Sequence, residues 1–159
     1  NNPKGDYLGE ILKFTEGDPV SKTSLTFEAS TYLAGGKETG FACPDNMAFD
    51  KAGNLWFTSD ISGSSMNQGA YTPFGNNGLF VVPSWGDHKG QVLQVASAPV
   101  DAELTGPFFA PDGQTLFLSV QHPGEGSPSL AVPTSHWPYG DGQMPRPAVV
   151  CISGPALLN

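Results

Sequence analysis

Short apolar runs separated by turn residues dominate this sequence. They are 3 to 7 residues long, rich in Phe, Val, Ile and Leu, and bounded by Gly, Pro, Asn or Asp. Such runs are typical of β-strands, whereas no stretch of ten or more residues has the periodicity of a helix. We therefore predict an all-β fold, with strands at residues 9–15, 25–29, 46–49, 55–59, 78–83, 91–96, 108–110, 116–120 and 148–152.

A repeated hairpin predicts how these strands are grouped. Residues 48–60 align with residues 108–121, and Thr115 is one extra residue in the second copy. In each copy a short apolar strand meets an Asp/Gly turn, at Asp50 or Asp112, and continues into a strand of aromatic and aliphatic side chains. The offset of 60 residues before the insertion is close to the length of one blade of a β-propeller.

The strand count predicts a partial β-propeller of about two to three blades, the C-terminal fragment of a larger propeller. In a single all-β region, residues 1–40 would supply the outer strands of one blade, residues 41–100 one full blade, and residues 101–159 an incomplete closing blade. Because about four to eight blades close a ring, the chain either belongs to a longer protein or pairs with other copies through its open strand edges. A β-sandwich is the alternative.

Charge and hydropathy limit the partners. Fifteen Asp and Glu against seven Lys and Arg give a net charge of −8, so the surface repels phosphate backbones and nucleic acid is not expected. An acidic surface suits cations, calcium above all. No stretch approaches the roughly 18 apolar residues of a membrane helix, so no membrane partner is expected. The two cysteines, Cys43 and Cys151, fit either one bridge or two thiols.

Oxygen-bearing side chains are predicted to gather at one end of the propeller channel. In a propeller, the residues before an innermost strand and those after the second strand are neighbours. This rule brings together Asp45, Asn46, Asp60, Glu103, Gln121 and His122, with Glu125 on the adjoining loop. Carboxylate and amide oxygens suit calcium, a histidine or cysteine suits a softer metal such as iron, and three carboxylates without a cation would repel one another. A metal site is the prediction.

Four of these residues also have a purely structural interpretation. Asp45 follows a proline and could cap a turn, Asp60 could lie in a solvated loop, and Glu103 could be a surface residue. His122 is isolated in the sequence, as structural histidines often are. The chain has no Gly-rich phosphate loop, no Gly-x-Ser-x-Gly and no His-Glu-x-x-His, so the residues alone identify no catalytic group.

Several segments, taken together and in order, resemble the PhoX-type secreted alkaline phosphatases. The less specific ones are residues 9–14, 33–36 and 43–56, and the more specific ones are residues 103–117, 120–125, 135–138 and 145–150. The resemblance covers nearly the whole chain and corresponds to the C-terminal part of that family. The chain departs from it at Cys43-Pro44-Asp45-Asn46, where many relatives have Pro-Asp-Gly.

The resemblance implies a calcium- and iron-dependent enzyme that hydrolyses phosphate monoesters and is exported to the periplasm or secreted. Members of the family are several times longer, and their cysteine iron ligand, phosphate-binding arginine and several carboxylates lie mostly upstream of the part matched here. The isolated chain is therefore expected to be inactive. The alternatives are a non-catalytic, calcium-stabilised propeller module and a lactonase-like propeller with calcium at the channel mouth.

Overall fold

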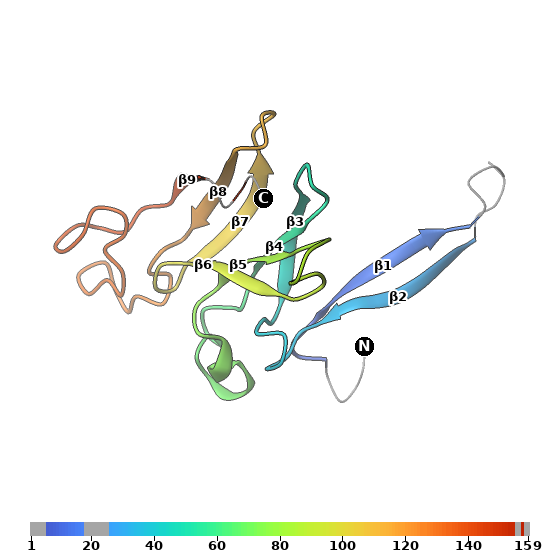
Figure 1. Ribbon diagram of the computed structural model, residues 1–159. Coiled ribbons are helices and arrows are strands. Elements are labelled where there is room, and N and C mark those ends of the chain that lie inside the picture. Colours follow the sequence, from blue (N-terminus) through green and yellow to red (C-terminus); the bar gives the residue numbers. More distant parts are fainter. Residues whose placement is uncertain (1–5, 18–25, 155–156, 158–159) are drawn as a thin grey trace.

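The strands form three separate antiparallel sheets in this computed structural model, which describes residues 6–17, 26–154 and 157 (Figure 1). The first sheet pairs β1 (Glu10–Glu16) with β2 (Phe27–Ala34). The second contains, in order, β3 (Pro44–Phe49), β4 (Leu55–Ser59), β5 (Gly78–Val82) and β6 (Leu93–Ser97). The third contains β7 (Glu103–Phe109), β8 (Thr115–Gln121) and β9 (Ala148–Ser153). A short 3-10 helix, η1 (Gly69–Phe74), lies between β4 and β5.

Each sheet is a meander of strands that follow one another in the chain, which is how propeller blades are built. The fold is all-β and corresponds to part of a β-propeller. The second sheet has four strands, the number found in one propeller blade, but the division of the chain into blades stays a prediction. The described strands form three sheets, whereas the alternative β-sandwich has two. In the described part of the chain, no helix is long and apolar enough to span a membrane.

Two predicted strands differ from the observed ones by several residues, and the other predicted bounds agree within two residues. The strand predicted at residues 108–110 begins at Glu103, because a register shift between Thr105 and Phe108 carries β7 past Gly106 and Pro107. A bulge of this kind absorbs a proline and a glycine that would otherwise end the strand. The strand predicted at residues 25–29 continues to Ala34, and its predicted first residue lies outside the described residues.

The core forms on both faces of β4, all of whose residues are buried. Side chains alternate between the faces of a strand, so Trp56 points to one side and Phe57 to the other. Trp56 packs against the third sheet in a cluster completed by Leu79, Ala98, Ala102, Leu104, Leu116, Leu118 and Val120. Phe57 lies on the opposite face, with its ring centroid 4.9 Å from that of Phe41 and 5.1 Å from that of Phe80. The second and third sheets therefore share a core.

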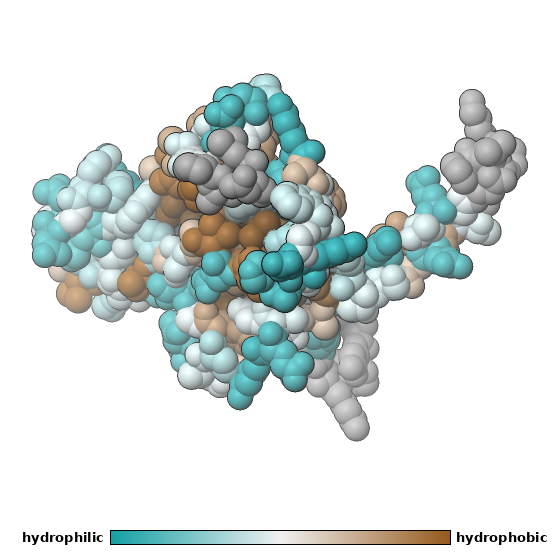
Figure 2. Space-filling model, viewed as in Figure 1, coloured by the Kyte–Doolittle hydropathy of each residue, from teal (hydrophilic) through white to brown (hydrophobic). Residues whose placement is uncertain are grey.

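The β1–β2 hairpin extends away from the other two sheets as an arm (Figures 1 and 2). Ile11 is buried against the second sheet. The large apolar side chains exposed along the arm are Leu12, Phe14, Phe27 and Tyr32. Little of the arm's apolar surface is thus buried in this chain.

Candidate metal centre

Glu103 is the buried carboxylate of the predicted site. It is the first residue of β7 and 9% exposed, and its Oε2 atom lies 3.4 Å from Nε2 of His122. Burial raises the pKa of Glu103. The negative charge of Asp60 raises this pKa further, and that of Asp45 does so more weakly. The hydrogen bond with His122 lowers it. The charges of Asp45, Asp60 and His122 therefore all act on the Glu103 carboxylate.

His122 connects Glu103 to a second carboxylate. Its Nδ1 atom lies 3.5 Å from Oε2 of Glu125, so each ring nitrogen has a carboxylate oxygen nearby. The residue directly follows β8 and has a φ of 34°, in the left-handed region that non-glycine residues seldom adopt. The backbone N–H of Glu125 donates to the His122 carbonyl at 3.0 Å. This tight turn holds both side chains at the same end of β8.

Asp60 is exposed and follows β4 directly. Its backbone N–H donates to the carbonyl of Cys43 at 2.9 Å, which fixes it beside the start of β3. The loop that follows comes close to Glu125, since a Cβ atom built on Gly63 would lie 3.1 Å from Oε2 of Glu125. The loops after β4 and after β8 therefore come close to each other.

Asn46 links the second sheet to the third. Its Oδ1 atom accepts hydrogen bonds from the backbone N–H of Gly106, at 2.7 Å, and from the hydroxyl of Thr105. Its Nδ2 atom donates to Oδ2 of Asp45 at 2.6 Å. The amide thus anchors the bulge of β7 and orients Asp45, a positioning role that the sequence analysis missed. The run Thr105-Gly106-Pro107 could have indicated the bulge, because the bulge lies at these residues.

Gln121 lies opposite Glu103 in the pairing of β7 with β8, so the two side chains are neighbours across the sheet. All seven predicted residues thus belong to the same end of the second and third sheets or to the loops that leave it. Whether they bind metal stays a prediction.

The donor set fits a metal in kind, because a buried carboxylate repelled by two others, beside an imidazole, offers oxygen and nitrogen ligands. In number it is incomplete. Among the residues that the structure describes, no three Asp, Glu, His or Cys side chains are grouped so that they could hold a metal ion by themselves. The residues that the structure describes therefore do not complete a metal site by themselves.

The two cysteines are both free. Cys43 is half-buried and has a φ of 51°. Burial raises the pKa of its thiol, and a hydrogen bond with Tyr71 partly opposes this. Cys151 is exposed on β9.

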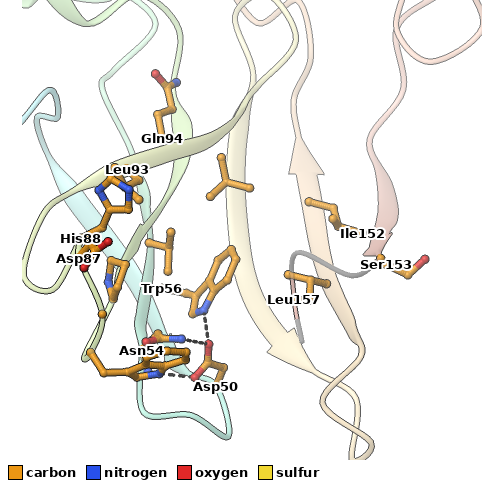
Figure 3. Close-up of a pocket in the computed structure, with 16 residues that line it drawn as sticks. Asp50, Asn54, Trp56, Asp87, His88, Leu93, Gln94, Ile152, Ser153 and Leu157 are labelled. Carbon is orange, nitrogen blue, oxygen red and sulfur yellow. Dashed lines mark hydrogen bonds between the residues drawn. The ribbon is translucent and has the colours of Figure 1, made fainter. Parts of the chain in front are cut away.

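A groove of about 510 Å³ lies at the other ends of these strands (Figure 3). Trp56, Leu93 and Ile152 line it together with the exposed Trp85. None of the seven predicted site residues lines this groove, which separates it from Glu103 and its neighbours.

Comparison with known proteins places the chain in a family. The sequence profile of the alkaline phosphatase PhoX family matches residues 1–124. The chain belongs to the PhoX alkaline phosphatase family. Its fold is similar to that of Pseudomonas fluorescens PhoX in complex with vanadate, a transition state analogue, with a TM-score of 0.74 and 28% sequence identity over 92% of this chain. The chain spans 26% of the length of that PhoX. A comparison with curated proteins finds no match.

Proposed function

We propose that this chain is the C-terminal propeller part of a metal-dependent phosphatase that hydrolyses phosphate monoesters. Membership of the PhoX family supports this, as does the likeness to a PhoX that binds vanadate as a transition state analogue. The observation that carries the proposal is the buried Glu103 carboxylate beside Asp60 and Asp45. Carboxylates stay ionised in such a cluster most readily when a cation neutralises them.

The metals in this proposal are calcium and iron, with most iron ligands outside this chain. Asp45, Asp60 and Glu103 are the first candidates for ligands, followed by Asn46, Gln121, His122 and Glu125. Bound metals would supply polarisation of a phosphoryl oxygen. The chain itself would contribute fixed carboxylates and a proton path. A proton on either ring nitrogen of His122 has a carboxylate oxygen of Glu103 or Glu125 within 3.5 Å.

The isolated chain should not catalyse the reaction, because most groups that would contact substrate and metal belong to the rest of the protein. Catalysis requires these groups to be held together in one geometry. A non-catalytic, calcium-stabilised module is the second candidate, favoured by the incomplete ligand set of the described residues. A lactonase-like propeller is the third.

The test is an assay of the full-length protein that carries this chain, with p-nitrophenyl phosphate and with a lactone as substrates. We expect hydrolysis of the phosphate ester, loss of that activity on chelation of calcium, and recovery when calcium returns. Glu103→Gln should lower kcat/KM at least about tenfold, whereas Glu28→Gln, on the exposed arm, should not change it. Turnover of the lactone alone would refute the phosphatase proposal. Turnover of phosphate ester by the isolated chain would show that the missing segments are not required.

The PhoX-type resemblance also supports a location in the periplasm or outside the cell. Fractionation of cells that express the full-length protein tests this, and retention in the cytoplasm would contradict it.

A further inference from the structure

We infer that Asn77 is a positioning residue that holds Asp60 and Glu103 at a fixed separation. This inference rests on the proposed function, in which both carboxylates are metal ligands. Asn77 lies immediately before β5 and is 1% exposed. Its side chain contacts the two residues that flank Asp60 and the residue that precedes Glu103.

The first set of contacts fixes Asp60 from both sides. The Oδ1 atom of Asn77 accepts from the backbone N–H of Ile61 at 2.6 Å and from the hydroxyl of Ser59 at 3.4 Å. Its Nδ2 atom donates to the carbonyl of Ile61 at 3.2 Å. Ser59 and Ile61 are the immediate neighbours of Asp60, and both are buried.

The second contact reaches the third sheet. Nδ2 of Asn77 also donates to the carbonyl of Ala102 at 3.3 Å. Ala102 is fully buried and directly precedes Glu103. The Asn77 backbone is itself held, because its carbonyl accepts from the N–H of Ala98 at 2.7 Å. The side-chain amide therefore connects the end of β4 to the start of β7, and the backbone of the same residue connects both to the end of β6.

Asparagine suits this position because its amide offers one acceptor oxygen and two N–H donors. All three are used here, as a buried polar side chain requires. Alanine would leave the carbonyls of Ile61 and Ala102 without these donors. The charge of Asp60 acts unfavourably on an ionised Glu103. Without the Asn77 side chain, this repulsion would therefore move the segment around Asp60 away from the start of β7.

The test compares Asn77→Ala with Asn54→Ala. Asn54 is a matched control because it is also a buried amide, 7% exposed, at the other end of the same sheet (Figure 3). Its Nδ2 atom donates to Asp50 at 2.8 Å, and its Oδ1 atom accepts from the N–H of Ser84 at 2.8 Å. Both variants should lower the melting temperature of the chain. Only Asn77→Ala should weaken calcium binding in isothermal titration, by about tenfold, the lower end of the effect of removing a residue that orients a metal ligand.

A milder variant covers the case in which Asn77→Ala does not fold. Ser59→Ala removes only the hydroxyl that bonds to Asn77 and to the N–H of Gly78, and we expect a weakening of calcium binding in the same direction, by about two- to threefold. The inference would be overturned if Asn77→Ala bound calcium as tightly as Asn54→Ala does. If Asn77→Ala does not fold, the same comparison is made between Ser59→Ala and Asn54→Ala.

Two further variants, Asp60→Asn and Glu103→Gln, test the proposed metal site itself in the same titration. If these two bind calcium as the unmodified chain does, the proposed metal site fails and this inference fails with it. If they weaken binding while Asn77→Ala and Ser59→Ala do not, only the role of Asn77 is wrong.

Discussion

At the scale of single residues, Glu103 shows how the fold creates a candidate site. Its carboxylate is buried at the start of β7, and its nearby partner, His122, offers a hydrogen bond at 3.4 Å. Burial and the charge of Asp60 together raise its pKa. A carboxylate in this position destabilises the folded chain when it ionises, unless a cation is present.

This raised pKa predicts the pH dependence of stability in metal-free buffer. The folded chain binds the Glu103 proton more tightly than the unfolded chain does. The stabilising contribution of that proton is therefore fully present below the ordinary pKa of about 4.5 and is lost as the pH rises through the raised pKa. Thermal unfolding should show Glu103→Gln gaining stability relative to the unmodified chain as the pH rises through this window. Glu28→Gln should show no such trend, and parallel curves for all three proteins would refute the prediction.

The sequence predicted which charged residues gather, because the ends of paired strands must meet. It did not predict that two side-chain amides, those of Asn46 and Asn77, position these residues. Asn77 lies in Asn76-Asn77-Gly78, which is typical of a turn, and only the packed structure shows that its side chain bonds to Ile61 and Ala102. The sequence places Asn46 near the site, but its contacts with Thr105 and Gly106 depend on a bulge in another sheet.

At the scale of elements, the repeated hairpins differ in how firmly their turns are held. The Asp50 carboxylate accepts from the backbone N–H groups of Ala52 and Asn54, from Nδ2 of Asn54 and from Nε1 of Trp56. The Asp112 carboxylate accepts from the N–H of Gln114.

Asp50→Ala should therefore destabilise the chain more than Asp112→Ala does. The first change leaves the buried Trp56 indole N–H without its acceptor and should lower the free energy of unfolding by about 2 kcal/mol, the second by about 0.5 to 1 kcal/mol. Urea denaturation of the two variants measures the difference. Equal losses would show that the Trp56 bond contributes little.

The arm formed by β1 and β2 should be the least stable of the three sheets. Ile11 is buried against the second sheet, but Leu12, Phe14 and Phe27 are exposed. Little buried apolar surface therefore opposes local opening of the arm. In hydrogen exchange on dilute protein, amides of β1 should exchange much faster than those of β4, whose residues are all buried. Similar protection of both strands would contradict this.

The positions of the strands were predictable because Gly, Pro, Asn or Asp residues lie close to the ends of most apolar runs. The long β7 was not, because Gly106 and Pro107 are residues that usually end strands. The bulge, anchored by Asn46, allows the strand to continue through them. Local patterns thus place every strand of the described chain, but they miss the later part of β2 and the earlier part of β7.

At the scale of the whole molecule, the three sheets are open. Among the described strands, each strand at the end of a sheet has one edge with no strand partner, namely β1, β2, β3, β6, β7 and β9. Such edges template pairing with other strands, and exposed apolar residues such as Phe49 and Phe108 add to the tendency. We therefore propose that the isolated chain self-associates. Light scattering should give an average mass above 16.7 kDa that rises with concentration, and a clean monomer at high concentration would contradict it.

The most direct test of the account is calcium titration of the chain and of its Glu103→Gln variant. The incomplete ligand set predicts weak binding, with a Kd of about 0.1 to 1 mM. Loss of the buried carboxylate should weaken it about tenfold, or about 1.4 kcal/mol, while Glu28→Gln binds like the unmodified chain. Equal calcium affinity of Glu103→Gln and the unmodified chain would contradict the claim that this end of the sheets contributes to a metal centre.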